Sequence, residues 1–419
     1  MDVNFTPLAS DAQDIAPDEI ARRFRWARRQ GNPAWLWPHI SPPRWREALE
    51  RIEGVVRALL PSSSTAAALE GEAAAIGLAG YTSGLGPLLG WWVEQGRLSC
   101  PAPLAAVLEL HLRHNRLRAA RMEAGAVAVV GALLERDIAV AVLKGAHTAR
   151  AYFPDPGARP ASDVDLLVAG GDARRAEAVL QSAGFVAKSR GPRESGWKPA
   201  AAPSAPRSLM LAHADDPWSV DLHSSLNVMV SPGAPLADLD AGAPLSGRER
   251  WAPCPGAVVL DQPLLLLHLA VHAGSGFQNL TLLRLTELNL VIGRDAASGD
   301  LSWDAFLDLG ARTGSLGFAY PALRLSEALT PGLVPPPVLE RCARSAPPGV
   351  RRVLEGMTPA SAQRIDRASV AEHFMWARGW SGRLRQIAFD LAPPGGSWRE
   401  VWSIYETRAW RLARGAFSR

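Results

Sequence analysis

The hydrophobic pattern changes at residue 138, and this change constrains the fold more than any other feature of the chain. Residues 103–135 carry the apolar spacing of a long helix, and Arg44–Leu60 carries the same spacing. Ile138–Leu143 is instead a short, continuous, valine-rich apolar run, which is typical of a buried strand. The chain therefore passes from a helical region into one that contains a sheet.

Residues 138–225 predict a small α/β unit. Its expected elements after the first strand are a helix over Ala146–Tyr152, a strand over Val164–Val168, a helix over Asp172–Ala183 and a strand from Phe185. Residues 190–206 are rich in Pro, Ser, Gly and Ala, so we expect a loop there. The runs Leu209–His213 and Trp218–His223 flank a turn and predict a hairpin.

Helical patterns lie on both sides of this unit. A Pro/Gly-rich connection over 226–256 leads to a helical region that begins near Gln262 and has a Pro-rich break at 331–349. We expect the α+β class, with a small mixed sheet flanked by mainly helical regions. The predicted divisions are an N-terminal helical region (1–135), an α/β core (136–230) and a C-terminal helical region (231–419).

Composition excludes several classes of protein. The chain has 419 residues, of which 47% are apolar and 21% charged, as in globular proteins and unlike disordered ones. Three widely separated cysteines indicate neither a disulfide framework nor a zinc site. The N-terminus lacks the pattern of a signal peptide, and no apolar run is long enough to cross a bilayer. We therefore expect a bacterial cytoplasmic protein without a transmembrane segment.

Two aspartates stand at the start of the second predicted strand. Side chains alternate along a strand, so Asp163 and Asp165 lie on one face and Val164 on the other. Two neighbouring carboxylates repel each other, and both stay ionised when a cation lies between them. Such oxygen ligands favour Mg²⁺, with Mn²⁺ as an alternative. A D-x-D pair alone is also common at the protein surface. The residues around it therefore decide whether it indicates a metal site.

A third acid lies on the last predicted strand of the unit. Ser219, Asp221 and His223 alternate with apolar residues that face the core. With Asp163 and Asp165, Asp221 completes a set of carboxylates that could bind the metal ions of a phosphoryl transfer. Taken singly, Asp221 could be a surface acid of the hairpin, and His223 a hydrogen-bonded structural histidine.

Lys144 and Gly145 end the first predicted strand. Glycine allows a phosphate to approach the backbone, and the free N–H groups where the next helix begins suit an anion. Lys144, one of only three lysines, would add a positive charge. Arg159 and Ser162 precede the aspartates and could contact phosphates or orient the first carboxylate. Gly145 alone could equally mark a plain turn.

Together these motifs resemble the nucleotidyltransferase superfamily with the polymerase-β-type palm. The pattern L-K-G…Y-F-P-D-P-G-x-R-P-x-S-D-x-D-L-L-V, followed by a later D-x-H, is similar more narrowly to a family of uncharacterised bacterial nucleotidyltransferases. It is also similar to the toxin nucleotidyltransferases of abortive-infection systems. Leu264 to Ile292, with His268, His272 and Arg284, resembles the C-terminal helical region of that family. The resemblance covers about Arg136–Ile292.

The resemblance implies a Mg²⁺-dependent transfer of a nucleotidyl group from an NTP, such as ATP, to a hydroxyl or phosphate. Asp163, Asp165 and Asp221 would bind metal, and Lys144 and Gly145 the triphosphate, with Arg159, Ser162 and His223 nearby. One departure is Ala146, which stands where the superfamily has a small residue that can be a phosphate-binding serine. The narrower family implies that Lys144 takes over this contact.

Several alternatives remain open at this stage. The acceptor could be a peptide, a sugar, a small molecule or an RNA, and the family suggests an accessory enzyme of peptide or polysaccharide biosynthesis. Competing readings are a tRNA-directed toxin, sugar transfer from a nucleotide sugar at the same metal site, and a non-catalytic nucleotide-binding scaffold. A net charge of +4 counts mildly against the toxin. Trp376–Arg419 mixes tryptophan and arginine and predicts an amphipathic helix, or a surface for acidic partners or headgroups.

Overall fold

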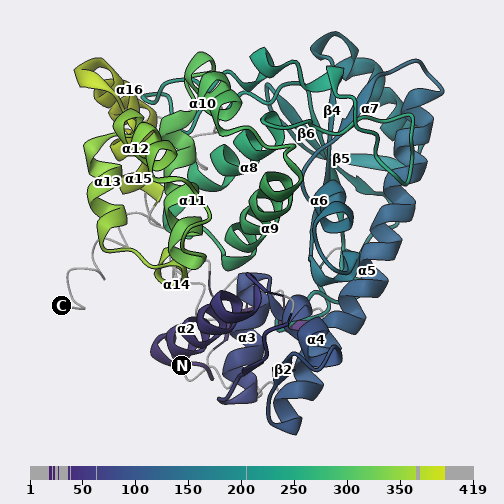
Figure 1. Ribbon diagram of the computed structural model, residues 1–419. Helices are drawn as coiled ribbons and strands as arrows, with labels where there is room; N and C mark the ends of the chain where they lie inside the picture. Colours follow the sequence, from purple (N-terminus) through teal and green to yellow (C-terminus); the bar gives the residue numbers. More distant parts are fainter. Residues whose placement is uncertain are drawn as a thin grey trace.

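The computed structural model describes residues 18–20, 22–23, 27, 36–37, 39–62, 64–203, 205–364 and 369–391. Three helices pack together at one end of the molecule: α2 (Pro42–Leu59), α3 (Ala73–Ser83) and α4 (Gly86–Glu94). Two short parallel strands, β1 (Ala67–Ala68) and β2 (Leu98–Ser99), join this group. The long helix α5 (Ala102–Leu134) leads from there to the main sheet (Figure 1).

The main sheet has five strands in the order β3-β4-β7-β6-β5. The strands are β3 (Val140–Val142), β4 (Asp163–Val168), β5 (Phe185–Arg190), β6 (Glu194–Pro199) and β7 (Ser219–His223). β4 and β7 run parallel, and the other neighbours are antiparallel. Between the strands lie α6 (Ala146–Ala151), the 3-10 turns η2 (Pro156–Ala158) and η3 (Gly170–Asp172), and α7 (Ala173–Ser182). The predicted mixed sheet and α+β class are confirmed.

Each face of the sheet meets a different layer. Val164, Leu166 and Val220 lie on one face, in a hydrophobic cluster that also contains α5 and α7 side chains such as Val129 and Leu180. Along β4 the side chains alternate, so Asp163, Asp165 and Leu167 lie on the opposite face. Leu167 belongs to the second hydrophobic cluster, which includes the C-terminal helices. The acids of β4 therefore face the C-terminal helical region.

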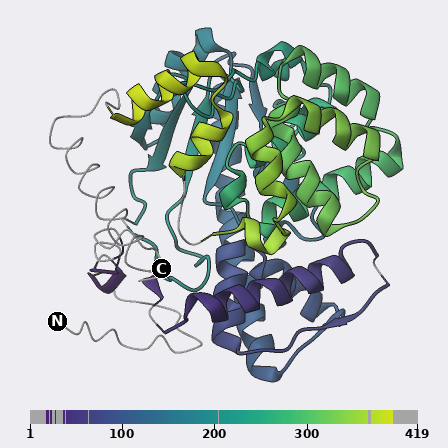
Figure 2. The same ribbon diagram turned by 90° about the vertical axis from the view of Figure 1, so that its left-hand side faces the viewer.

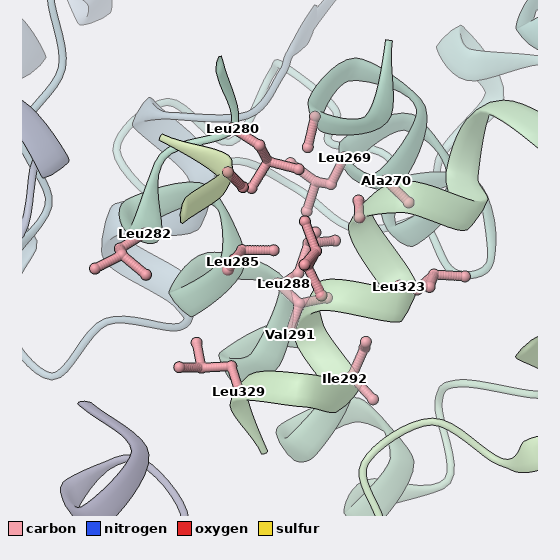
Figure 3. Close-up of a cluster of buried hydrophobic side chains, with 14 of the residues drawn as sticks. Leu269, Ala270, Leu280, Leu282, Leu285, Leu288, Val291, Ile292, Leu323 and Leu329 are labelled. Carbon is pink, nitrogen blue, oxygen red and sulfur yellow. The ribbon is translucent and has the colours of Figure 1, made fainter. Parts of the chain in front are cut away.

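The elements that follow β7 in the described part of the chain are all helices or 3-10 turns (Figures 1 and 2). After the 3-10 turns η4 (Leu239–Gly242) and η5 (Pro244–Ser246) come α8 (Leu264–Gly274), the turn η6 (Phe277–Asn279), α9 (Leu282–Ser298), α10 (Trp303–Arg312) and α11 (Leu316–Leu329). The chain continues through α12 (Pro336–Ser345), α13 (Pro348–Glu355), α14 (Pro359–Ala362), α15 (Ser369–Trp376) and α16 (Gly379–Leu391). Figure 3 shows α8, α9 and α11 sharing a leucine-rich core, with Leu269, Leu288 and Leu323 inside it. This packing fixes the α8–α9 pair beside the sheet.

Three sequence predictions are wrong. Residues 190–206 are not all loop, because β6 lies within them and buries Trp197 completely. The hairpin over 209–223 does not form, because β7 pairs with β4 and β6, while the peptide before it is fixed by Arg118 of α5, which donates to the Asp216 carbonyl. The Pro-rich break at 331–349 contains α12, which begins directly after Pro335 with proline in its first turn, where no N–H is needed.

Some predictions lie partly or wholly outside the described residues. Residues 392–419, which make up most of the Trp/Arg-rich C-terminal segment, belong to this group. The three predicted divisions stay a prediction. In the part of the chain that the structure describes, no helix combines the length and the apolarity needed to cross a bilayer.

Candidate functional site

A cleft of about 760 Å³ lies between the acidic face of the sheet and the helices α8 and α9. All eight residues singled out from the sequence line it: Lys144, Gly145, Arg159, Ser162, Asp163, Asp165, Asp221 and His223. The structure therefore brings these residues together from β3, β4, β7 and the connecting loops. Their chemical roles stay predictions.

The parallel pairing of β4 and β7 places the acids side by side. Asp165 pairs directly with Asp221, and Asp163 pairs with Ser219. Because paired residues on neighbouring strands point to the same face, the three carboxylates form one group. Asp165 is buried, whereas Asp163 and Asp221 are half-buried. Ser162 Oγ donates to Asp163 Oδ2 at 3.4 Å, so Ser162 helps to orient the first carboxylate.

Two side chains contact the buried Asp165. Lys144 Nζ lies 2.5 Å from Asp165 Oδ1, and His223 Nε2 lies 3.0 Å from the same oxygen. The backbone reinforces the pairing, because Leu143 N–H donates to the Asp165 carbonyl at 3.0 Å. Burial alone would raise the pKa of Asp165, but Lys144 and His223 together hold it well below its ordinary value. Asp165 is therefore an ionised carboxylate whose charge is balanced by the Lys144 ammonium group.

The pKa of Asp221 is shifted in the opposite direction. Burial, and then the charges of Asp163, Asp165 and Glu194, raise the pKa of Asp221 to about 6, while His223 opposes the shift. Glu194 lies across the sheet on β6, with its Oε2 3.6 Å from His223 Nδ1. Negative charge around Asp221 is thus only partly neutralised, as expected where a cation binds.

A glycine on β6 makes room for this arrangement. Gly196 pairs with Asp221, and a Cβ atom at this position would lie 2.6 Å from Ser189 Oγ and 3.4 Å from Asp221 Oδ1. Glycine inside a strand weakens it and often marks such a close approach. This explains why a strand with a glycine in its middle borders the acids.

A buried ion pair holds the loop that precedes β4. Arg159 donates from Nε and Nη2 to the two carboxylate oxygens of Glu287 on α9, at 2.8 and 3.0 Å. Thr148 of α6 also donates to Glu287. Gly145 has a φ of 64°, and a Cβ there would lie 3.4 Å from Arg159 Nη1. Glu287 therefore ties α6, the 155–162 loop and the C-terminal helices into one unit around Gly145.

The helical wall of the cleft carries His268 and His272 from α8 and Arg284 from α9. Both ring nitrogens of the buried His268 lack a hydrogen-bond partner among the described residues. Burial, followed by the charge of Lys144, lowers the pKa of His268 to about 3 and that of His272 well below its ordinary value. The Arg284 guanidinium forms no hydrogen bond or ion pair within the same set of residues, although the charges of Glu287, Asp163 and Asp165 act on it. A guanidinium that donates no hydrogen bond to a carboxylate has donors available for an anionic ligand.

The donor set suits a hard cation. Carboxylate oxygens are the ligands of Mg²⁺, and Mg²⁺ commonly uses one or two carboxylates and takes the rest from water and phosphate. Over the ranges that the structure describes, no three His, Cys, Asp or Glu side chains converge as ligands of one ion. Lys144 contacts the buried Asp165 instead. Asp163 and Asp221 form no ion pair with any residue that the structure describes, so the residues present fit a Mg²⁺ ion that takes its other ligands from water or phosphate.

Several polar residues of the cleft were not part of the predicted site, and three of them carry charges that bear on it. Glu287 and Glu194 were missed, and Arg284 was noted only as part of the resemblance. Glu287 is buried in the largely apolar helix α9, where a charged side chain needs a partner, and this is a signal that the sequence does carry. Glu194 lies in the stretch that was predicted as a loop, so nothing in the sequence indicated that it lies beside His223.

Comparison with known proteins identifies one relationship. A family model described as "uncharacterised nucleotidyltransferase" matches residues 82–331, which is more than half of the chain. Searches of curated proteins and of solved structures found no match. The matched residues include α5, the whole sheet, and α8 to α11, so they contain every residue of the cleft.

Proposed function

This chain belongs to the uncharacterised nucleotidyltransferase family, and from that premise we propose that its cleft performs a Mg²⁺-dependent transfer of a nucleotidyl group from an NTP to an acceptor. The observation that carries the proposal is the juxtaposition of three carboxylates with an opposite wall of basic and imidazole groups. Acids suit the metal, and the opposite wall suits the phosphates. Kinship with the polymerase-β-type superfamily forms part of the proposal and is supported by the mixed sheet that carries the acids.

Different residues of the cleft would bind the metal and the phosphates. Asp163 and Asp221 would hold Mg²⁺ together with phosphate oxygens, and Asp165 would join them when Lys144 turns to the substrate. When bound, Mg²⁺ neutralises charge on the transferring phosphate. Arg284, and His272 beside it on the same wall, would contact the remaining phosphates. The cleft then acts by positioning and by charge neutralisation.

Lys144 is the group that would change partners. In the described structure it neutralises the buried Asp165 and so preserves the site. A triphosphate would offer Lys144 several oxygens, and Asp165 would then be free to join the residues that hold Mg²⁺. The exchange would keep every buried charge paired before and after binding. Asp221, which lies beside the other two acids, would also accept the proton from an acceptor hydroxyl.

Isothermal titration with the four NTPs, with and without Mg²⁺, tests this function. Asp163→Asn is the best variant, because the only side-chain hydrogen bond of Asp163 in the described structure is the long one from Ser162. Asp308→Asn, an exposed residue on α10, is the matched control for loss of one carboxylate. We expect Mg²⁺-dependent binding of at least one NTP, weakened at least tenfold by Asp163→Asn and unchanged by Asp308→Asn. Binding that ignores both Mg²⁺ and Asp163 would contradict the proposal.

A further inference from the structure

A second, smaller cavity of about 240 Å³ lies between α5, α6 and the turn η2. It shares four lining residues with the cleft: Gly145, Arg159, Ala161 and Asp163. Asp163 is thus reached from both sides. The volume falls below the roughly 300–1,000 Å³ of pockets that bind whole drug-sized ligands. The side pocket therefore fits a single ring or a short chain that approaches Asp163 from the side opposite the helical wall.

The lining of the side pocket is mainly apolar. Small or apolar side chains from four elements contribute to its wall: Ala119, Met122, Ala146, Ala149, Pro156 and Val164. Such a surface favours an apolar group, since each Å² removed from water contributes about 25 cal/mol. The composition differs from that of the cleft, where acids and basic groups face each other.

Every arginine at the side pocket already has partners. Arg116 donates to Asp155 at 2.8 Å and to Glu94 at 2.7 Å. Arg118 donates to three backbone carbonyls, and Arg150 to Glu123 at 3.0 Å. Arg159 is held by Glu287. Three of the four guanidinium groups are paired with carboxylates, and Arg118 donates from Nε, Nη1 and Nη2 to carbonyls. Because every guanidinium already has hydrogen-bond partners, the side pocket favours a neutral group over a phosphate.

One buried polar atom in the wall lacks a partner. Asn115 is 1% exposed, and its Nδ2 donates to the Gly157 carbonyl at 2.6 Å. Its Oδ1 accepts no hydrogen bond from any residue that the structure describes. Leaving a buried acceptor unsatisfied costs about 1–3 kcal/mol, so such atoms usually have a partner in protein, water or ligand. A ligand with a hydroxyl or amine donor would supply one.

We propose that the side pocket binds the acceptor, and that the acceptor is a small, neutral, largely apolar molecule or terminal group that carries a hydroxyl. This inference rests on the proposed function. The acceptor oxygen forms a bond to the α-phosphorus of the NTP, and the bond from that phosphorus to the bridging oxygen breaks. Pyrophosphate leaves with the electron pair, and the hydroxyl proton passes to a carboxylate of the cleft. The size and charge of the pocket disfavour an RNA or a phosphate acceptor.

Ligand-observed ¹⁹F NMR with 4-fluorophenol as the probe tests the side pocket. Fluorobenzene lacks the donor, and 4-fluorophenyl phosphate adds the charge, so the three probes separate the two features. Ala119→Leu fills the pocket, while Ala128→Leu makes the same change at an exposed position of the same helix, outside the pocket. We expect 4-fluorophenol to bind wild type and Ala128→Leu alike, and at least tenfold more weakly to Ala119→Leu. Fluorobenzene and the phosphate should bind at least threefold more weakly than 4-fluorophenol to wild type.

Any of three results would overturn the assignment. 4-Fluorophenol could bind wild type and Ala119→Leu equally, or it could fail to bind wild type. Alternatively, 4-fluorophenyl phosphate could bind wild type more tightly than 4-fluorophenol does. Titration of the same samples with Mg²⁺ and NTP separates this failure from that of the proposed function. If the protein binds Mg²⁺-NTP but the probe test fails, the nucleotide site is supported and the acceptor pocket is refuted. If the protein binds the probe as expected but binds no nucleotide, the proposed function is refuted, and so is the role of the pocket as an acceptor site.

Discussion

Replacing Asp221 by asparagine should stabilise the metal-free protein at neutral pH. Burial and the charges of Asp163, Asp165 and Glu194 raise the pKa of Asp221 from 3.8 to about 6. One pKa unit corresponds to about 1.4 kcal/mol, so ionising this carboxyl would cost about 3 kcal/mol if it were fully buried. Asp221 is only half-buried, and solvent screening reduces the figure to about 1–2 kcal/mol. Asparagine has the same shape, and Asp221 makes no hydrogen bond that the substitution would remove from the described structure.

The sign of the pH dependence follows from the raised pKa. A group whose pKa is higher in the folded state stabilises the fold below its unfolded value and loses this contribution as the pH rises through the folded value. For Asp221 the window is about pH 4 to 6. Wild type and Asp221→Asn should therefore be equally stable near pH 4, and the variant should be more stable at pH 8.

Urea denaturation at pH 4 and pH 8, in the presence of a chelator, measures this difference. Asp308→Asn serves as the control for loss of a remote carboxylate and should show no such pH-dependent gain. Adding Mg²⁺ and NTP should stabilise wild type and not Asp221→Asn, because only the wild type retains the ligand. A variant that is less stable than wild type at pH 8 would refute the electrostatic reasoning.

Two further predictions concern the buried ion pairs. Lys144→Met leaves the Asp165 carboxylate buried without its cation and should cost about 3–5 kcal/mol, while Asp165→Asn in the same chain should recover most of the loss. Equal losses in the single and double variants, measured by urea denaturation, would show that the pair is not coupled. Glu287→Leu should destabilise the fold by a similar amount, and Arg159→Met in the same chain should restore much of it. Additive losses in that double-mutant cycle would contradict the pairing.

The sequence indicated the acids well, because their signals are local. Asp163 and Asp165 share a face by strand alternation alone, and Lys144-Gly145 follows an apolar run. Asp221 was grouped with them through the same alternation, although its strand was assigned to the wrong pairing. The parallel register of β4 and β7 needed the structure, since the connection between these strands includes α7, β5 and β6.

The sequence did not indicate which residues far apart in the chain contact each other. Arg159 was predicted to contact phosphate or to orient the first carboxylate, and nothing in the sequence indicated that Glu287, 128 residues away, holds its guanidinium. Composition also concealed β6, because its Gly196 weakens the strand signal while allowing the close approach to Asp221. In both cases the decisive contact depends on tertiary packing.

The central claim is that the cleft transfers the α-phosphate group of an NTP, with its nucleoside, to a hydroxyl. Incubation with Mg²⁺ and an NTP labelled with ³²P at either the α or the γ position, in the presence of small neutral alcohols or phenols, tests it most directly. We expect the α label to appear in an acceptor adduct, the γ label to appear in pyrophosphate, and both products to be lost in Asp163→Asn. Transfer of the γ label, or α-label transfer that persists in Asp163→Asn, would contradict it.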